Sequence, residues 1–160
     1  MRACVQRVSR AKVTVADEIT GSIGAGYMIL LGVSSEDTLA ELDLLVNKIA
    51  NLRILDDGDG VMNRSATDYL KDDPDSLAML VVSQFTLYGD VRKGRRPSWI
   101  KAAPPHLAEP MVTAFCDEMR SLGFRVETGV FGAEMAVELV NDGPVTIWLD
   151  TDDLRGPRRG

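Results

Sequence analysis

The sequence has little of what many hydrolytic and metal-dependent enzymes rely on. Its 160 residues contain one histidine, His106, and two cysteines, Cys4 and Cys116. A single histidine leaves a Ser-His-Asp triad no choice of base and gives a zinc site no second imidazole, so neither chemistry is favoured. The two cysteines are far apart and form no Cys-x-x-Cys pair. We therefore expect buried, reduced thiols, no bound metal and no cofactor.

Long apolar runs and an excess of positive charge are also missing. No stretch approaches the roughly 20 apolar residues that span a bilayer, and the opening "MRACVQRVSR" lacks the apolar core of a signal peptide. We expect a cytoplasmic protein with no membrane partner. Eighteen Lys and Arg against 24 Asp and Glu give a net charge of −6, which argues against bulk adhesion to nucleic acid.

The patterns that are present indicate a single α/β domain. Strand-like runs dominate, among them "YMILLGV" and "LAMLVVSQFTLYG". Two segments have helical spacing: one follows "SSED", with Ser34 as its expected cap, and one contains Pro110, expected in its first turn or at a kink. We take residues 66–76 as a surface loop. These patterns predict a sheet-rich α/β domain followed by a disordered basic tail over 151–160.

The strand end "SQFTLYGD", residues 83–90, is the first candidate site. Ser83, Gln84 and Thr86 place hydrogen-bonding side chains where an apolar strand meets its loop, and functional residues concentrate at such positions. Capping of backbone groups explains the same residues without any activity. Thr86 is a weak candidate nucleophile, because no histidine, lysine or amino terminus is visibly paired with its hydroxyl.

The segment "RKGRRPSWIK", residues 92–101, concentrates cations in an otherwise acidic chain. Such a run is often only a solvated loop. Arginine guanidinium groups together with Trp99, however, fit the phosphates and unstacked bases of an RNA end. The candidate RNA-binding cations are Arg92, Lys93, Arg95, Arg96 and Lys101.

The segment "NDGPVT", residues 141–146, lies between two runs that alternate apolar and polar residues. Its simplest interpretation is a hairpin turn, since glycine supplies a positive φ and proline fixes its own.

Taken together, "SQFTL", "RRPSW" and "NDGPVT" closely resemble the motifs of the D-aminoacyl-tRNA deacylase family, in the same order and at similar separations. "VQRVSRAKVTV" and "GAGYMILLGV" resemble that family's opening strands. The resemblance runs from Met1 to about Asp150, and it implies a mixed or antiparallel barrel-like sheet with two packed helices over residues 1–150. It implies an ester hydrolase that releases D-amino acids, and glycine mischarged on tRNA, from the terminal ribose, and that rejects L-aminoacyl-tRNA. This is a chiral proofreading activity in translation quality control.

The resemblance also implies a set of site residues. Main-chain groups near Phe85 and Thr86 would hold the ester while a ribose hydroxyl of the substrate assists. Family members are homodimers, so a Gly143-Pro144 pair joined by a cis bond would reach into the partner's pocket and exclude an L side chain. The implied catalytic residues are Ser83, Gln84, Phe85 and Thr86, and the implied substrate-binding residues are Leu87, Ala103, Phe131, Met135, Gly143, Pro144, Val145 and Thr146.

Several alternatives stay open at this level. A noncatalytic RNA-binding module would use the basic loop and Trp99 and would bind charged and free tRNA alike. A structural homodimer without a ligand explains neither motif. Whether Thr86 orients the ester or attacks it, which D-amino acids and tRNAs are preferred, and what segments 66–76 and 151–160 contribute are not decided by the sequence.

Overall fold

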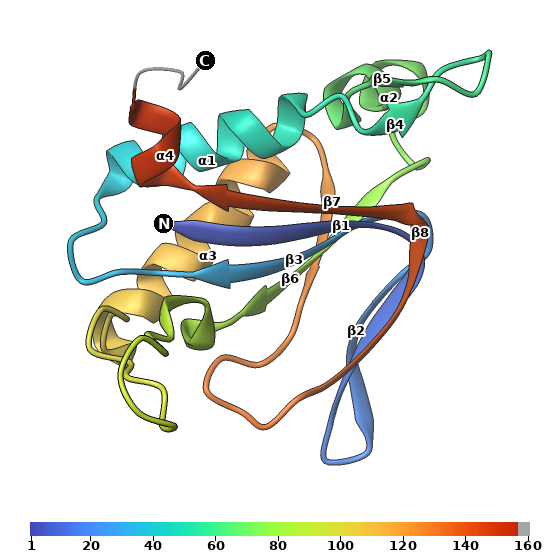
Figure 1. The fold of residues 1–160 in the computed structure, drawn as a ribbon. Coiled ribbons are helices and arrows are strands. Elements are labelled where there is room, and N and C mark those ends of the chain that lie inside the picture. Colours follow the sequence, from blue (N-terminus) through green and yellow to red (C-terminus); the bar gives the residue numbers. More distant parts are fainter. Residues whose placement is uncertain (157–160) are drawn as a thin grey trace.

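A computed structural model describes residues 1–156 and shows one mixed sheet covered by helices (Figure 1). None of the helices in this part of the chain has the length and hydropathy needed to cross a membrane. The six strands of the sheet are β1 (Arg2–Val15), β2 (Glu18–Ile23), β3 (Gly26–Gly32), β6 (Ala78–Ser83), β7 (Arg125–Thr128) and β8 (Ala136–Asp150).

The long strand β1 organises this sheet. It pairs antiparallel with β3 through residues 2–8, with β2 through residues 11–15, and with β8 along nearly its whole length. The pairs β3–β6 and β6–β7 are parallel. The far edges approach each other where Arg125 of β7 donates to the carbonyl oxygen of Ser22 in β2, at 3.5 Å. The sheet is therefore nearly closed, which confirms the predicted mixed, barrel-like α/β fold.

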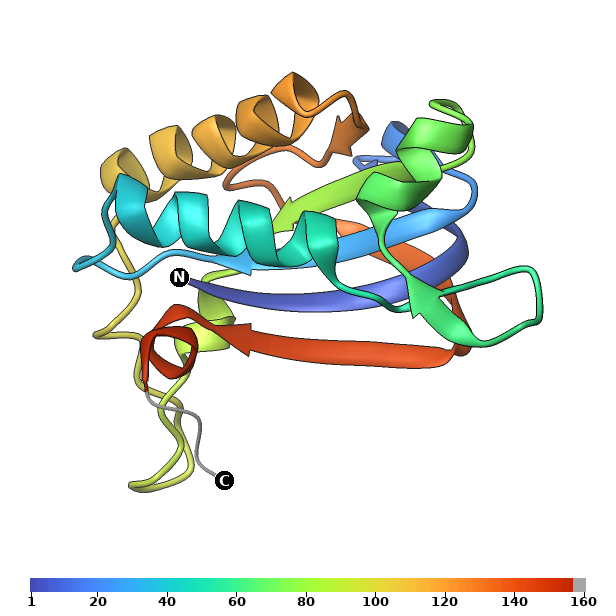
Figure 2. The same cartoon turned by 90° about the horizontal axis from the view of Figure 1, so that it is seen from above.

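Two long helices lie side by side over one face of the sheet, α1 (Leu39–Asn51) and α3 (Pro105–Ser121) (Figure 2). Leu42, Leu45 and Ile49 of α1 are fully buried, as are Phe115 and Met119 of α3. Cys116 is buried as expected, and burial raises its pKa to about 11. Cys4 is only half-buried, so the expectation of two buried thiols holds for one of them.

The start of α1 differs from the prediction. Thr38, not Ser34, is the N-cap: its hydroxyl accepts from the Ala40 N–H, and the Glu41 carboxylate accepts from the Thr38 N–H at 2.7 Å. Ser34 instead forms a turn in which its own N–H donates to Asp37. Both segments carry the serine or threonine and acidic residue of a capping box, but only Thr38 lies directly before the apolar stripe.

Segment 66–76, predicted to be a loop, contains helix α2 (Ala66–Asp72). Ser65 and Asp68 form a capping box, and Tyr69 and Leu70 pack against the core, which stabilises a helix too short to persist alone. This helix follows a small hairpin of β4 (Leu55–Asp56) and β5 (Met62–Arg64), as the turn residues 57–60 predict.

The segment predicted as a disordered tail also contains ordered structure. Thr151–Arg155 form helix α4, capped by the Asp150 carboxylate. Thr151 is buried, its hydroxyl accepts from the amino terminus, and Arg155 pairs with Glu41 of α1. These contacts with distant residues, invisible in a local pattern, explain the order; residues 157–160 of the predicted tail lie outside the described residues.

Two further predictions about elements are corrected. The run "LAMLVVSQFTLYG" is not one strand, because β6 ends at Ser83 and a short 3₁₀ helix, η1 (Phe85–Tyr88), follows. Of the two positions expected for Pro110, the first turn is wrong, since α3 begins at Pro105 and Pro110 lies inside it, while the kink stays a prediction.

We predict that Gly26→Ala disrupts the fold while Gly24→Ala, two residues earlier, does not. Gly26 has φ +151°, and an added Cβ would lie 1.8 Å from the Ala78 carbonyl oxygen, where β3 meets β6. We expect Gly26→Ala to lower the free energy of unfolding in urea by more than about 3 kcal/mol. Gly24 has no atom within 4 Å of such a Cβ, so its substitution should change stability by less than about 0.5 kcal/mol. Equal stabilities would show that the two strands separate easily there.

Candidate active site

A cavity of about 560 Å³ opens at the carboxyl end of β6. The end of β6, the start of α3 and the loop before β8 form its walls, and the lining is mostly apolar. Such a volume and composition are typical of sites for small organic groups. The residues that line it are Leu31, Val33, Val82, Ser83, Gln84, Phe85, Trp99, Ala102, Ala103, Pro105, Ala108, Val112, Phe131, Gly132, Ala133, Met135 and Val137.

The polar side of this cavity is the segment between β6 and η1. The Gln84 N–H donates to the Leu31 carbonyl oxygen at 2.7 Å, which fixes the main chain as it leaves the sheet. The Leu87 N–H then donates to the Gln84 oxygen, closing the first turn of η1. The amides of Phe85 and Thr86 precede this first bond, so the helix itself supplies them with no acceptor. Two consecutive main-chain donors thus follow one another where Phe85 lines the cavity and Thr86 continues from its edge.

The Thr86 hydroxyl is held by its neighbour. The Gln84 side-chain amide donates to Thr86 Oγ1 at 2.6 Å. An amide donor takes up a lone pair of the hydroxyl and removes no proton, so this contact orients Thr86 and does not activate it. His106, on the first turn of α3, is not part of the cavity lining. In residues 1–156 no three His, Cys, Asp or Glu side chains gather closely enough to hold a metal ion.

Phe85 and Trp99 form an aromatic pair at the cavity. Their rings meet edge to face, with centroids 5.3 Å apart, although both side chains remain substantially exposed. Trp99 is fixed by an antiparallel bridge between Asp90 and Ser98 and by close packing on Gly89, where an added Cβ would lie 2.7 Å from the indole. An exposed but rigid aromatic surface is suited to stacking against a planar ring.

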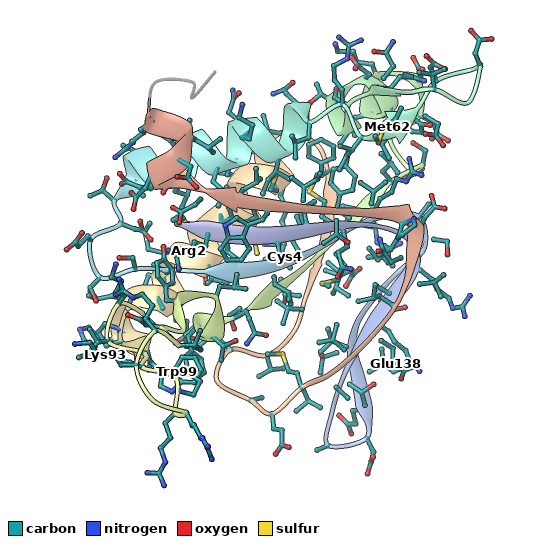
Figure 3. All side chains as sticks on the ribbon, viewed as in Figure 1. Arg2, Cys4, Met62, Lys93, Trp99 and Glu138 are labelled. Atoms are coloured by element: carbon teal, nitrogen blue, oxygen red, sulfur yellow. The ribbon has the colours of Figure 1, made fainter. Side chains whose placement is uncertain are left out.

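The predicted RNA-binding loop projects from the same end of the molecule, and Figure 3 shows Lys93 and Trp99 on it. Arg92 forms a bidentate ion pair with Asp90, with N–O distances of 2.5 and 2.9 Å, and this contact holds the pKa of the Asp90 carboxyl well below its usual range. The other cations, Lys93, Arg95, Arg96 and Lys101, are exposed and form no ion pair within residues 1–156.

The "NDGPVT" segment is not a hairpin turn. The residues on both sides of it pair with β1: Asn141 opposite Val8 and Thr146 opposite Gln6. The extra residues 142–145 therefore form an outward excursion within one continuous strand, β8. The expected cis bond between Gly143 and Pro144 is confirmed.

Side chains below the excursion fix its shape. Arg7 donates through Nε to the Asp142 carbonyl oxygen at 3.3 Å and forms an ion pair with the Asp142 carboxylate at 3.0 Å. Asn141 donates to the carbonyl oxygens of Arg7 and Val145, both at 2.9 Å, while Gln6 donates to the Thr146 hydroxyl at 3.2 Å. Gly143 and Pro144 themselves are exposed.

The structure gathers some of the predicted site residues and separates others. Those that line the cavity are Ser83, Gln84, Phe85, Ala103, Phe131 and Met135. Thr86 and Leu87 continue from its polar edge, the Leu87 carbonyl oxygen accepting from Arg2 at 2.9 Å. The predicted residues Gly143–Thr146, of which the first three belong to the excursion, are not part of this cavity.

Sequence reasoning did not include several cavity residues among the site residues, notably Trp99, Ala102 and Val112. Trp99 was visible within the basic loop as an aromatic residue among cations. The alanine and valine carry no comparable signal, because ordinary core positions use the same residue types.

The chain is similar over nearly its whole length to known proteins. The family described as D-Tyr-tRNA(Tyr) deacylase matches residues 4–150. A D-aminoacyl-tRNA deacylase of Thermomicrobium roseum is 56% identical over 156 residues, covering 98% of this chain and 97% of the relative. A D-aminoacyl-tRNA deacylase of Thermus aquaticus is 51% identical over 158 residues, covering 99% and 100%.

Two solved structures have the same fold. A protein described as c-Myc DNA unwinding element binding protein is 43% identical and superposes with a TM-score of 0.84, covering 94% of this chain and 98% of that one. A probable eukaryotic D-amino acid tRNA deacylase superposes with a TM-score of 0.79 at 19% identity, covering 92% and 97%, a likeness that concerns the fold alone.

Proposed function

The chain belongs to the D-Tyr-tRNA(Tyr) deacylase family and hydrolyses the ester of D-aminoacyl-tRNA, and we propose that this reaction takes place in the cavity at the end of β6. The observation that carries the proposal is the arrangement around that cavity. It places the Ser83–Phe85 main chain, an apolar chamber, an aromatic pair and exposed cations at one end of the molecule. Because aminoacyl-tRNA is a substrate found in the cytoplasm, we propose that the enzyme acts in the cytoplasm.

Each part of the substrate has a matching surface. The exposed rings of Phe85 and Trp99 suit stacking with the terminal nucleobase, and Ala103, Phe131 and Met135 supply apolar walls for the terminal nucleoside. The basic loop suits the phosphates that follow, since a few cations suffice to hold an acceptor end while a net charge of −6 disfavours bulk nucleic acid.

The ester requires little side-chain chemistry. An aminoacyl ester is already activated, so positioning and main-chain donors replace a strong base. We assign the amides of Phe85 and Thr86 to the carbonyl oxygen of the ester, where each such donor contributes about 10²–10³ in rate. The neighbouring ribose hydroxyl of the substrate assists the attack of water. Ser83 and Gln84 shape this turn, and Gln84 holds Thr86 in place.

The Gly143-Pro144 excursion supports a homodimeric enzyme. The excursion is exposed and is held by the Arg7 side chain, yet it does not line the cavity of the same chain. In a two-fold dimer each excursion would enter the partner's cavity, because an isologous interface exchanges the same segment in both directions. Main-chain oxygens placed there would occupy the space of an L side chain and leave a D side chain, or glycine, unobstructed.

We predict that the basic loop determines tRNA affinity. Replacing Arg95 and Arg96 with alanine should weaken binding and lower the slope of log affinity against log salt by about 1 to 2, as phosphate contacts are lost. The charge-matched control replaces Lys48 of α1 and Lys71 of α2 with alanine. If the two double variants bind alike in a salt titration, the loop is only a solvated surface.

We also predict that Thr86→Ala remains active. Its hydroxyl contacts an amide and no base, so its loss should lower kcat on D-aminoacyl-tRNA by no more than about tenfold, whereas removing a nucleophile costs about 10⁴-fold or more. The measurement is single-turnover deacylation, with mass spectrometry of the quenched enzyme. A complete loss of activity in a folded protein, or a covalent acyl-threonine in the parent, would assign the attack to Thr86.

A third prediction concerns chirality. The parent should release D-tyrosine and glycine from tRNA and leave L-tyrosyl-tRNA intact. Pro144→Ala should lower the ratio of D to L hydrolysis by about tenfold or more, because the excursion loses its shape. Glu138→Ala, on β8 outside the excursion, is the control. Unchanged ratios in both variants would remove the excursion from enantiomer selection while leaving the deacylase activity in place.

A further inference from the structure

The hairpin β4–β5 and helix α2, together residues 55–72, form a lobe to which the proposed reaction assigns no role. The lobe is remote from the cavity lining, which contains none of its residues. Figure 1 shows it next to the corner at which β8 bends, and the view in Figure 2 places it there as well. The contacts between the lobe and this corner of β8 indicate a role for the lobe.

Arg7 of β1 joins the lobe to the excursion. Its side chain is 10% exposed, and its Nη1 donates to the Ile54 carbonyl oxygen and to Asp56 Oδ1, each at 3.0 Å. From the other side, Nε contacts Asp142 as described above. The guanidinium is planar and rigid, so acceptors on two of its edges fix its position and its tilt together.

Gly143 lies close to this guanidinium. A Cβ added at Gly143 would lie 2.9 Å from Arg7 Nη2. No side chain fits between Gly143 and the guanidinium, and the same guanidinium holds the preceding residue, Asp142, so we expect a shift of Arg7 to move the Gly143 main chain. The position of the excursion thus depends on whatever holds Arg7.

The lobe is built to hold Asp56. Tyr69 of α2 donates its hydroxyl to the Asp56 carbonyl oxygen at 2.8 Å, and the Arg64 guanidinium lies over the Tyr69 ring at 4.6 Å. Arg7 is itself buried, so removing its carboxylate partners would leave an uncompensated charge. Tyr27, fully buried, has the one buried side-chain polar atom without a hydrogen-bond partner in residues 1–156. Burial raises the pKa of Tyr27, while the Arg7 charge acts in the opposite direction. Asp56 and Asp142 are the carboxylates that balance Arg7.

We propose that Asp56 is a positioning residue for enantiomer selection: through Arg7 it sets the place of Gly143 and Pro144, and the lobe fixes the main chain of Asp56. The inference rests on the proposed role of the excursion in rejecting L substrates. Asp56 touches no substrate and supplies no step of the hydrolysis. Its contribution is to the geometry that distinguishes the two enantiomers.

The test compares Asp56→Ala with Asp59→Ala. Both remove one carboxylate from the same hairpin, but the Asp59 side chain makes no ion pair or hydrogen bond within residues 1–156, so effects of net charge on tRNA binding cancel. We expect Asp56→Ala to lower the ratio of kcat/KM on D-tyrosyl-tRNA to that on L-tyrosyl-tRNA by about tenfold or more. The change should come mainly from faster L hydrolysis, with the D rate within about threefold of the parent. Asp59→Ala should leave the ratio unchanged.

Two further variants separate positioning from general destabilisation. Asp56→Asn keeps an acceptor for Arg7 without the charge and should restore much of the selectivity. Tyr69→Phe removes only the hydroxyl that holds Asp56 and should lower selectivity partially, at little cost in thermal stability. If Asp56→Ala is too unstable to assay, these two variants alone decide the matter. Lower melting temperatures with a D-to-L ratio equal to that of the parent would reduce the lobe to a structural support.

Comparison with Pro144→Ala separates the role of Asp56 from the role of the excursion. If Pro144→Ala lowers the ratio and the Asp56 and Tyr69 variants do not, this inference fails and the role of the excursion stands. If none of them changes the ratio, the proposed role of the excursion fails and the inference fails with it. If the double variant Asp56→Ala with Pro144→Ala is no less selective than Pro144→Ala alone, both residues act through the same segment.

Discussion

The pairing of β1 with β8 is the constraint on which the rest of this structure depends. It runs from Arg2 opposite Asp150 to Thr14 opposite Ala136, so it joins the two ends of the described chain along one ladder. Because β8 has more residues than β1 across the middle of that ladder, residues 142–145 have no partner and project outward. The same strand β1 presents Arg7 beneath the excursion and pairs with β3 on its other edge. A single antiparallel ladder thereby fixes the excursion, its support and the edge from which the sheet continues toward the cavity.

The cavity shows how little reactive chemistry this fold uses. Its walls are mostly apolar, its polar edge is formed by the segment from Ser83 to Phe85, and the hydrogen bond from Gln84 to the Thr86 hydroxyl orients that hydroxyl without activating it. Such a site depends on rigidity, and the structure supplies it by hydrogen bonding the main chain at Gln84 to β3 and by seating Trp99 against Gly89. An activated ester suits an enzyme of this kind, since preorganised donors lower its barrier without a tuned acid or base.

Charged residues form two distinct clusters in this structure. Acidic residues outnumber basic ones, yet exposed cations gather on one loop, and Asp90 neutralises the Arg92 guanidinium at its base. On the opposite side of the molecule, the buried Arg7 is balanced by two carboxylates that come from separate elements, the lobe and β8. The loop cations are exposed and accessible to phosphates, whereas the Arg7 guanidinium is buried and holds two segments together through carboxylates that are about half exposed.

The sequence by itself determined the fold class, the two long helices, the 57–60 turn and the motif at the end of β6, because apolar periodicity and turn residues are local signals. It also indicated, through family resemblance, the cis bond at Pro144, which no local pattern distinguishes from a hairpin turn. Only the tertiary structure decided that Asn141 and Thr146 pair with the same strand, that α2 and α4 are helices, and that Asp56 reaches Arg7. Those outcomes depend on contacts between residues far apart in the chain, such as Thr151 with the amino terminus or Tyr69 with Asp56. Local sequence patterns do not report such contacts, because their energy arises only when the folded sheet brings both partners together.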